Sequence, residues 1–503
     1  MSELVAHGRG IHQRRRWLVA PAVVVLALLG AACVPPTEPP SLVATASLVD
    51  GGILVDWQQP EDFTGTFEVQ VRSEDSEWTT FAVTSVPRAT FMGVDNHTSY
   101  LFRVRSAPGL AGIAGPWSPE VGALYVDLVL PVVRIDTGGQ PILDRENYVR
   151  GTVEIDPNGS DVEAYAGTMG LRGRGNSTWT NYPKKPYRMR LDSKSEIMGM
   201  AAERDWALLA NYIDRSQLRT WTAMQISEAT DLPYTPTVRH VEVVLNGQYD
   251  GVYVLTQHNE VGPDRVDITE MGPGDTSGDA LTGGYRLEID FRMEWEEDPG
   301  FRTGANVPIV VKDPSPLATE QLSYIKSRIQ AFETALLGPN FAHPTEGYRA
   351  YVDVASFIDH YLVQEVTRNQ DAFHGSTFFT KERGDALFRF GLVWDFDRSM
   401  GTNAEIPTPP EGWWARTTGA WAPRFFHDPA FVEALVQRWD QLEPAIRSIV
   451  DQLESRSAQL QPARDNDAAR WGYTHAVRDS GSFLKSWMTT RIDWIDAQLG
   501  AGS

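Results

Sequence analysis

The hydrophobic period of this 503-residue chain changes along its length, and that change limits which folds the chain can adopt. Apolar and polar residues alternate up to about residue 124, in short runs that Gly, Pro or Asp end about every 8 to 12 residues. In residues 318–337, in residues 351–369 and near the C-terminus, apolar side chains instead recur at helical spacing. The chain is also too long for one ordinary domain. We therefore expect an all-β module first and then a larger α+β domain with a helical end.

The N-terminus has the features of an export signal. Arg14, Arg15 and Arg16 precede an apolar run of 13 residues, 17–29, and small residues follow up to Cys33. This order is typical of a secretory signal, and the run is shorter than a membrane-spanning helix requires. Cys33, the only cysteine, stands where a bacterial lipoprotein signal has its acylated residue; the alternative is simple cleavage near Ala32.

These features predict a lipoprotein-type signal over residues 1–33 and a stiff Pro-rich spacer over residues 34–41. The protein is then expected to be extracytoplasmic, either secreted or held at the cell membrane by a lipid on Cys33. Because the chain has a single cysteine, it forms no internal disulfide, and apolar cores must stabilise its domains.

The net charge excludes some partners. Residues 1–32 hold four arginines and one glutamate, so their removal changes the formal charge from −21 to −24. Nucleic acids and anionic lipid headgroups require a basic surface, and neither is expected as the main partner. An acidic chain is compatible with divalent cations and with basic protein substrates.

Residues 42–126 are predicted to form the all-β module, a β-sandwich. Trp57 lies on an early strand, and Tyr100, Phe102 and Val104 alternate on a late one. This pattern resembles a fibronectin type III domain, in which Trp57 and Tyr100 would belong to the core. Such a module implies binding or spacing, and it carries no residues that indicate chemistry.

Residues 130–500 are predicted to form the α+β domain. Residues 239–257 hold two β-branched runs around Asn246-Gly247, a strong hairpin signal, and residues 283–291 and 307–313 add two strands. The amphipathic helices follow. We expect a curved antiparallel sheet early in this domain and a helical lobe late.

Three acids in this domain point to phosphoryl transfer. Asp371 ends a helical run, and Asp395 and Asp397 end the strand that follows a short aromatic segment. Phosphoryl transfer uses one carboxylate to orient the attacking hydroxyl and others to hold Mg²⁺ against the phosphates. The alternative is that these acids end their elements because they face water.

A second candidate site lies in the basic segment 171–192. Gly173 and Gly175 let the backbone bend closely around an anion. Short donors follow at Asn176, Ser177 and Thr178, and positive charge is added by Lys184, Lys185, Arg188 and Arg190. The segment is not a P-loop. A basic surface turn without a ligand is the alternative.

Seven blocks in this order resemble the spore-coat-protein-H (CotH) kinase family: LPVVRIDT, RGRGNSTW with YPKKPYRMRL, DWALLANYIDRSQLRT, VEVVLNGQYDGVYVLT, GGYRLEID, FIDHYLVQEVTRNQDAF and GLVWDFDRSMG. The resemblance covers most of residues 130–400. It implies an atypical protein kinase fold with an N-lobe sheet and a helical C-lobe. It also implies use of ATP with Mg²⁺ or Mn²⁺ to phosphorylate serine or threonine on secreted or surface proteins.

Site residues follow from the same resemblance. Asp371 matches the catalytic aspartate, which accepts the proton of the substrate hydroxyl. Asp395 matches the metal-binding acid, and Asp397 is the second acid of its motif. Lys184 and Lys185 match the basic pair after the glycine-rich turn Gly173–Asn176, and one of them is expected on the ATP phosphates.

Two positions depart from the family pattern. Ser376 stands where asparagine is usual, and as a metal ligand a hydroxyl is poorer than a carboxamide oxygen. Gln257 stands where glutamate is common as the expected partner of the nucleotide lysine, and Glu260 is a candidate substitute. The activity of the kinase is therefore left open.

Five other acidic or basic positions have a structural alternative. Asp214 and Arg219 are expected to cap and anchor a helix rather than to touch ligand. Glu288 and Asp290 alternate on a strand and form either an inward-facing pair near the site or a solvent face. His374 is either a surface side chain or a substrate contact.

The leading hypothesis is a secreted or surface-anchored Ser/Thr kinase that transfers the γ-phosphate of ATP to extracytoplasmic proteins. The first alternative is a surface scaffold or adhesion protein whose kinase-like lobe is weak or inactive. A carbohydrate-processing enzyme that uses two carboxylates is a third interpretation, because sequence does not give the distance between Asp371 and Asp395.

Overall fold

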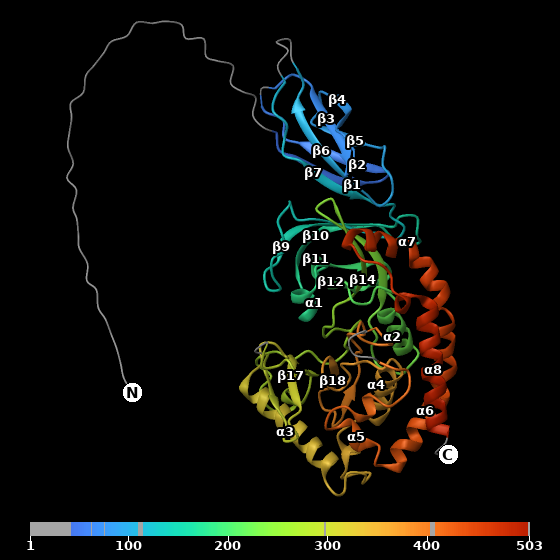
Figure 1. Ribbon diagram of the computed structural model, residues 1–503. Helices are drawn as coiled ribbons and strands as arrows, with labels where there is room; N and C mark the ends of the chain where they lie inside the picture. Colours follow the sequence, from blue (N-terminus) through green and yellow to red (C-terminus); the bar gives the residue numbers. More distant parts are fainter. Residues whose placement is uncertain are drawn as a thin grey trace, which may run out of the picture.

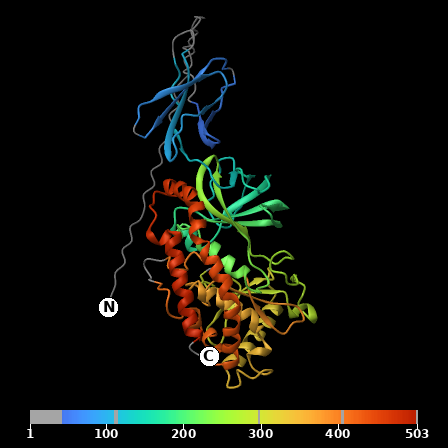
Figure 2. The ribbon, with the colours of Figure 1, turned by 90° about the vertical axis from the view of Figure 1, so that its right-hand side faces the viewer.

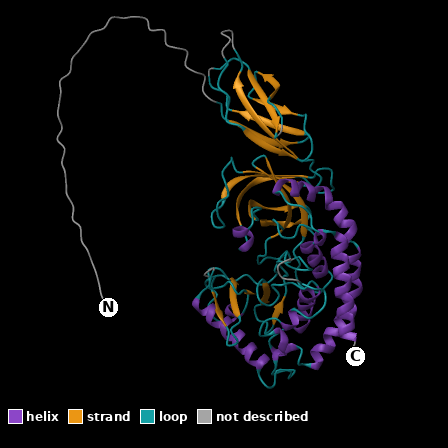
Figure 3. Cartoon of the chain, in the orientation of Figure 1, coloured by secondary structure: helices purple, strands orange, loops and turns teal. Residues whose placement is uncertain are grey.

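The computed structural model describes residues 42–61, 63–74, 76–108, 114–295, 298–402 and 408–500. The predicted signal 1–33 with Cys33 and the spacer 34–41 lie outside the described residues. The described chain is mostly β-structure in its N-terminal part, including a closed barrel, and helical toward its C-terminus (Figures 1 and 3). None of the helices described is both long enough and apolar enough to cross a membrane.

The first unit is a sandwich of two antiparallel sheets. One sheet has the order β1-β2-β5 and the other β4-β3-β6-β7. Their alternating inward side chains share one core, which buries Trp57 and Tyr100 as predicted. The strands are β1 (Ala44–Val49), β2 (Gly52–Trp57), β3 (Phe67–Ser73), β4 (Thr79–Thr84), β5 (Arg88–Phe91), β6 (Thr98–Ser106) and β7 (Val121–Tyr125).

A closed barrel of seven strands follows, in the order β10-β11-β12-β14-β13-β8-β9. All its pairs are antiparallel except β8 with β13. Its interior is filled by Val, Ile, Leu, Met and aromatic side chains from alternate positions. The strands are β8 (Val132–Asp136), β9 (Val149–Asp156), β10 (Tyr165–Gly173), β11 (Tyr187–Ile197), β12 (Met200–Leu209), β13 (Val238–Leu245) and β14 (Gln248–Gln257). The predicted curved sheet is therefore closed on itself.

The predicted hairpin at Asn246-Gly247 joins β13 to β14 and also contacts the sandwich. Both turn residues have positive φ, 50° and 74°, which this sequence accommodates. The amide of Leu48 donates to the carbonyl of Gly247 at 2.7 Å, and the Gln248 side chain donates to the carbonyl of Ala46 at 2.6 Å. The hairpin thus joins the sandwich to the barrel.

A second sheet, separate from the barrel, has the order β16-β17-β15-β18-β19. The strands predicted near residues 283–291 and 307–313 form, but they pair with each other and with β18 rather than with the early sheet. The elements are η1 (Asp279–Thr282), β15 (Tyr285–Ile289), β16 (Gly300–Arg302), β17 (Pro308–Asp313), β18 (Thr377–Lys381) and β19 (Phe388–Phe390).

The helices pack around this second sheet in one large apolar core. Two longer helices coincide with the predicted helical runs, α3 (Thr319–Leu337) and α4 (Val354–Val366). The remaining helical elements are α1 (Ser177–Asn181), α2 (Arg219–Glu228), η2 (Tyr348–Ala350), η3 (Ala415–Thr417), α5 (Ala422–Phe425), α6 (Pro429–Asp451), α7 (Leu453–Trp471), η4 (Val477–Asp479) and α8 (Gly481–Gly500).

The last helices join the barrel to the helical body, which consists of the second sheet and the helices packed around it. Helices α7 and α8 lie side by side, and α7 reaches the barrel strand β14 (Figure 2). Arg470 donates to the carbonyl of Tyr249 at 2.7 Å, and the indole of Trp471 donates to the carbonyl of Asp250 at 3.0 Å. The C-terminal helices therefore hold the barrel against the helical body.

Candidate active site

A cavity of about 1180 Å³ lies between the barrel and the second sheet. Its lining includes loops at one end of the barrel, strands β15 and β17, and the segments around Asp371 and Asp395. Many of these side chains are charged, in equal measure acidic and basic. A space of this size and polarity fits a charged ligand.

The three predicted acids Asp371, Asp395 and Asp397 all line this cavity. Asp371 lies in the turn after α4, where its carbonyl accepts the amides of His374 at 3.1 Å and Gly375 at 2.8 Å. Asp395 has a positive φ of 67°, which aspartate tolerates better than most residues. Phe396, fully buried in the core between the two acids, anchors their segment.

Burial and mutual repulsion change the protonation of these acids. Burial, with the charge of Asp395 as the second cause, raises the pKa of Asp371 to about 6. Burial, followed by the charges of Asp395 and Asp371, raises the pKa of Asp397 well above its ordinary value. None of the three carboxylates accepts a hydrogen bond from the residues that the structure describes. Buried carboxylates that lie near one another and accept no hydrogen bonds are stabilised by a bound cation.

The chemistry of this set fits a divalent metal ion, since carboxylate oxygens are the ligands that Mg²⁺ and Mn²⁺ prefer. Ser376 also lines the cavity and is buried, with a positive φ of 47°. Within the described ranges, however, no three His, Cys, Asp or Glu side chains are grouped closely enough to hold one ion.

The glycine turn contributes Gly175 and Asn176 to the lining, whereas Gly173 lies behind it. A Cβ on Gly173 would lie 2.5 Å from the ring of Trp179, so this glycine makes room for the indole. Arg145 donates to the carbonyl of Gly175 at 2.9 Å and to the side chain of Asn176. The turn is therefore held in a fixed position at the cavity.

The structure does not bring Lys184 and Lys185 to the acids, and neither lines the cavity. Lys184 is fully buried between the barrel and α7, where its ammonium donates to Asp467 at 2.7 Å and to the carbonyl of Val252. Lys185 donates to the carbonyl of Trp179. The role of these lysines at the ATP phosphates stays a prediction from the family resemblance.

Glu288 and Asp290 point inward and line the cavity. Burial raises the pKa of Glu288 to about 7, although the charge of Lys312, 3.5 Å away, acts in the opposite direction. Asp290 accepts hydrogen bonds from Arg292. His374 is outside the lining and stacks on Phe291, with 4.3 Å between ring centroids.

The two departures from the family pattern have different surroundings. Gln257 is buried outside the lining, where its side-chain oxygen accepts the amide of Thr237 at 2.9 Å. Glu260 lines the cavity and pairs with Arg188. Glu260 therefore has a cationic partner at the cavity, and that partner is an arginine.

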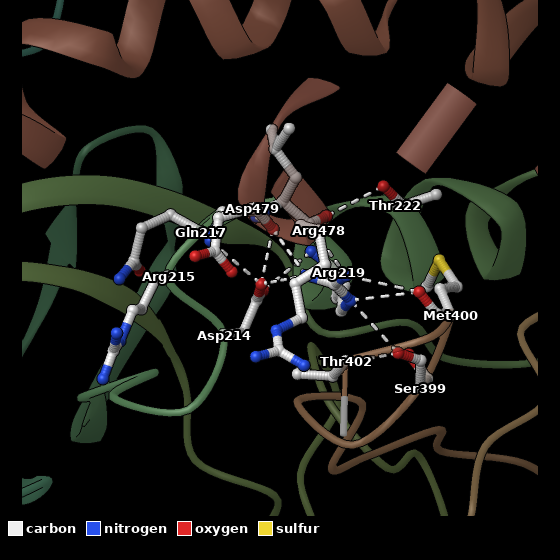
Figure 4. Close-up of polar contacts among 12 residues, drawn as sticks. Asp214, Arg215, Gln217, Arg219, Thr222, Ser399, Met400, Thr402, Arg478 and Asp479 are labelled. Carbon is white, nitrogen blue, oxygen red and sulfur yellow. Dashed lines mark hydrogen bonds and ion pairs between the residues drawn. The ribbon is translucent and has the colours of Figure 1, made fainter. Parts of the chain in front are cut away.

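Asp214 and Arg219 anchor a helix, as expected (Figure 4). Arg219 also holds the acidic segment, residues 395–402, which carries Asp395 and Asp397. Asp214 accepts the amide of Arg219, the first residue of α2, at 2.9 Å and its guanidinium at 2.7 Å. Arg219 also donates to the carbonyls of Ser399 at 3.1 Å and Arg478 at 2.9 Å. Neither Asp214 nor Arg219 lines the cavity.

Sequence reasoning named Arg188 and Arg190, which line the cavity, but it missed other arginines of the lining, among them Arg174 and Arg286. Arg174 stands between Gly173 and Gly175, and this position in the glycine turn is the sequence feature that could have marked it as a site residue. The ring of Trp394 lies 5.4 Å from the guanidinium of Arg174 and precedes Asp395 directly. In the part of the chain that the structure describes, the cations that line the cavity are thus seven arginines and Lys312, and neither Lys184 nor Lys185 is among them.

Comparison with known proteins gives one family. The family model described as CotH kinase protein matches residues 171–495. A comparison with curated proteins finds no match.

Solved structures give only weak likenesses. A Fn3-like protein from Clostridium thermocellum is 20% identical over 18% of this chain and 98% of its own, with a TM-score of 0.15. Titin kinase with its flanking domains is 10% identical over 47% of this chain and 41% of its own, with a TM-score of 0.16. The twitchin kinase region from C. elegans is 10% identical over 91% of this chain and 70% of its own, with a TM-score of 0.19. Scores this low do not establish a shared fold.

Proposed function

Because this chain belongs to the CotH kinase protein family, we propose that it is an atypical Ser/Thr kinase that transfers the γ-phosphate of ATP to proteins. The observation that carries the proposal is the convergence of Asp371, Asp395 and Asp397 on one large, charged cavity. The family membership makes the protein kinase-like; the acceptor and the activity itself belong to the proposal.

In this mechanism Asp371 orients the acceptor hydroxyl and accepts its proton during attack on the γ-phosphate. Asp395 and Asp397 would hold the divalent ion, with Ser376 as a further ligand. The ion, when bound, neutralises charge on the phosphate oxygens. Phe396 and the bonds that Arg219 makes to the carbonyls of Ser399 and Met400 keep the acidic segment in place.

The same proposal includes location and architecture. A lipoprotein-type signal with Cys33 would export and anchor the protein, and the substrates would be secreted or surface proteins. The sandwich, which shares the fibronectin type III pattern of Trp57 and Tyr100, would act as a spacer between membrane and kinase. The boundaries 42–126 and 130–500 of these units stay predictions.

The test is transfer of radiolabel from ATP to a serine-rich protein with Mn²⁺ present. Asp371→Ala and Asp395→Ala are each expected to lower the rate at least roughly 100-fold, since both act on the reacting groups. The matched control is Asp493→Ala, which removes an exposed acid of α8 and is expected to leave the rate unchanged. Wild-type rates in both cavity variants would contradict the proposal.

A second candidate function is an inactive kinase-like scaffold. It is favoured by Gln257, whose uncharged side chain is occupied by the amide of Thr237, and by the hydroxyl of Ser376 in place of a carboxamide. Calorimetry with ATP and Mn²⁺ separates the two functions. No binding, or binding without radiolabel transfer in the assay above, would indicate the scaffold, and binding with transfer the kinase.

A further inference from the structure

Arg174 occupies a rigid position at the mouth of the barrel. It lies between β10 and α1, and its amide donates to the carbonyl of Pro186 at 3.1 Å. The glycines on either side are both constrained, Gly173 by the adjacent indole and Gly175 by its positive φ of 76°. The backbone therefore directs one arginine side chain into the cavity, over the ring of Trp394.

The guanidinium of Arg174 has no hydrogen bond or ion pair with any residue that the structure describes. The other arginine and lysine side chains of the lining all have such a partner: Arg145, Arg188, Arg190, Arg286, Arg292, Lys312 and Arg398. An arginine stays protonated in proteins and offers five N–H donors. Leaving them without partners in a partly buried place is unfavourable, which favours an anionic ligand.

The surroundings specify the anion further. Asp395 and Asp397 lie close enough to attract the Arg174 cation electrostatically. A single carboxylate ligand would satisfy the guanidinium but would leave the two acids facing each other. A polyphosphate can contact the planar guanidinium with one group while another lies against a cation held by these acids.

We propose that Arg174, rather than Lys184 or Lys185, binds the phosphates of a nucleoside di- or triphosphate in this cavity. This inference rests on the proposed function and names the residue that recognises its nucleotide. Lys184 is unsuited to this role, because its ammonium is fully buried and already bonded to Asp467.

The experiment is calorimetric titration of the full chain with ATP and Mn²⁺, and separately with adenosine. Arg174→Gln is expected to weaken ATP binding roughly 10- to 100-fold, the size of lost charged hydrogen bonds, while adenosine affinity changes less than about 2-fold. Arg174→Lys keeps the charge but not the planar fork, and an intermediate loss is expected. The charge-matched control is Arg150→Gln, an exposed residue of the barrel that pairs with Asp192 and should leave both affinities unchanged.

The fold is checked by the thermal midpoint without nucleotide, which Arg174→Gln is expected to change little, because the guanidinium has no hydrogen bond or ion pair to lose among the described residues and only its contact with the Trp394 ring is removed. ATP affinity equal to wild type in Arg174→Gln would overturn the inference and leave the proposed function standing. Equal losses for ATP and adenosine would also overturn it, because the effect would not belong to the phosphates. A wild-type chain that binds neither ligand would overturn the proposed function and the inference together.

Discussion

At the scale of single residues, the cavity combines acids that are destabilised by burial with several arginines that are paired with acids. Glu288 is an informative case because it is not assigned to metal or acceptor. It faces Lys312 on β17 and lies near Asp290, Arg292 and Arg286. Burial outweighs these cations and raises its pKa to about 7 from the ordinary 4.5.

We predict that this carboxyl makes the protein less stable as the pH rises. The folded state binds the proton of Glu288 more tightly than the unfolded state, so the free energy of unfolding falls between about pH 4.5 and 7. At about 1.4 kcal/mol per pKa unit, the full contribution is about 3.5 kcal/mol, of which about 2 to 3 kcal/mol is lost between about pH 5 and pH 8. The free energy of unfolding is measured with urea at about pH 5 and pH 8, with chelator present. Its decrease between these pH values should be smaller by this amount in Glu288→Gln than in the wild type.

The matched control for this experiment is Glu120→Gln, an exposed glutamate of the sandwich whose removal should not alter the pH dependence. If Glu288→Gln and the wild type lose the same free energy of unfolding between these pH values, Glu288 ionises at its ordinary pH and the prediction is wrong.

At this scale, the position of a site residue could be predicted from the sequence only where the residues it meets lie nearby in the chain. Asp371, Asp395 and Asp397 lie within one continuous stretch, and the structure brings all three to the cavity. The position of Lys184 could not be predicted in this way, because its partner Asp467 is 283 residues further along the chain. A lysine that follows a glycine turn looks the same in sequence whether its partner is a ligand or a distant carboxylate.

At the scale of secondary structure elements, α2 and the acidic segment are joined by one buried arginine (Figure 4). Arg219 is fully buried, and its guanidinium reaches Asp214, Ser399, Met400 and Arg478 at once. A planar fork with five donors can make these bonds, and an ammonium cannot. The position of Asp395 and Asp397 thus depends on a residue outside the cavity.

We predict that Arg219→Lys loosens this segment although it keeps the positive charge at position 219. The free energy of unfolding should fall by about 1 to 3 kcal/mol, because buried carbonyls lose their donors. Amide hydrogen exchange over residues 395–402 should become faster, while exchange in the barrel strands stays unchanged. The control is Arg215→Lys, since Arg215 donates to the carbonyl of Thr474 and does not reach the acidic segment. Unchanged protection of residues 395–402 in Arg219→Lys would show that the segment is held by other contacts.

Element types were largely predictable, whereas sheet membership was not. The Asn246-Gly247 hairpin and helices α3 and α4 follow from local pattern, because their stabilising contacts lie within the element or next to it. Closure of the barrel depends on β8 pairing with both β9 and the distant β13. No local pattern indicates such pairs, nor does one indicate that β15 and β17 join β18 in a separate sheet.

At the scale of the whole molecule, α7 is the element that makes one body of the barrel and the helical part. Its Asp467 accepts the ammonium of Lys184 at 2.7 Å, the amide of Val252 at 2.8 Å and the hydroxyl of Tyr473 at 2.5 Å. Both partners of the ion pair are essentially inaccessible to solvent. Since the cavity lies between the two bodies, this junction fixes the distance between its walls.

We predict that Lys184→Met lowers the free energy of unfolding by about 3 to 5 kcal/mol, because Asp467 is left as an uncompensated buried charge. The double variant Lys184→Met with Asp467→Asn should lose less than the single variant, since it removes both charges of the pair. Guanidinium unfolding of both variants measures the difference, and Lys185→Met, which alters a partly buried neighbour, should cost less than about 1.5 kcal/mol. The family resemblance implies that one lysine of this pair contacts ATP; if that lysine is Lys184, Lys184→Met would lose ATP affinity and keep its stability. The two outcomes assign opposite roles to the same side chain, one at the junction of the two bodies and the other at the nucleotide.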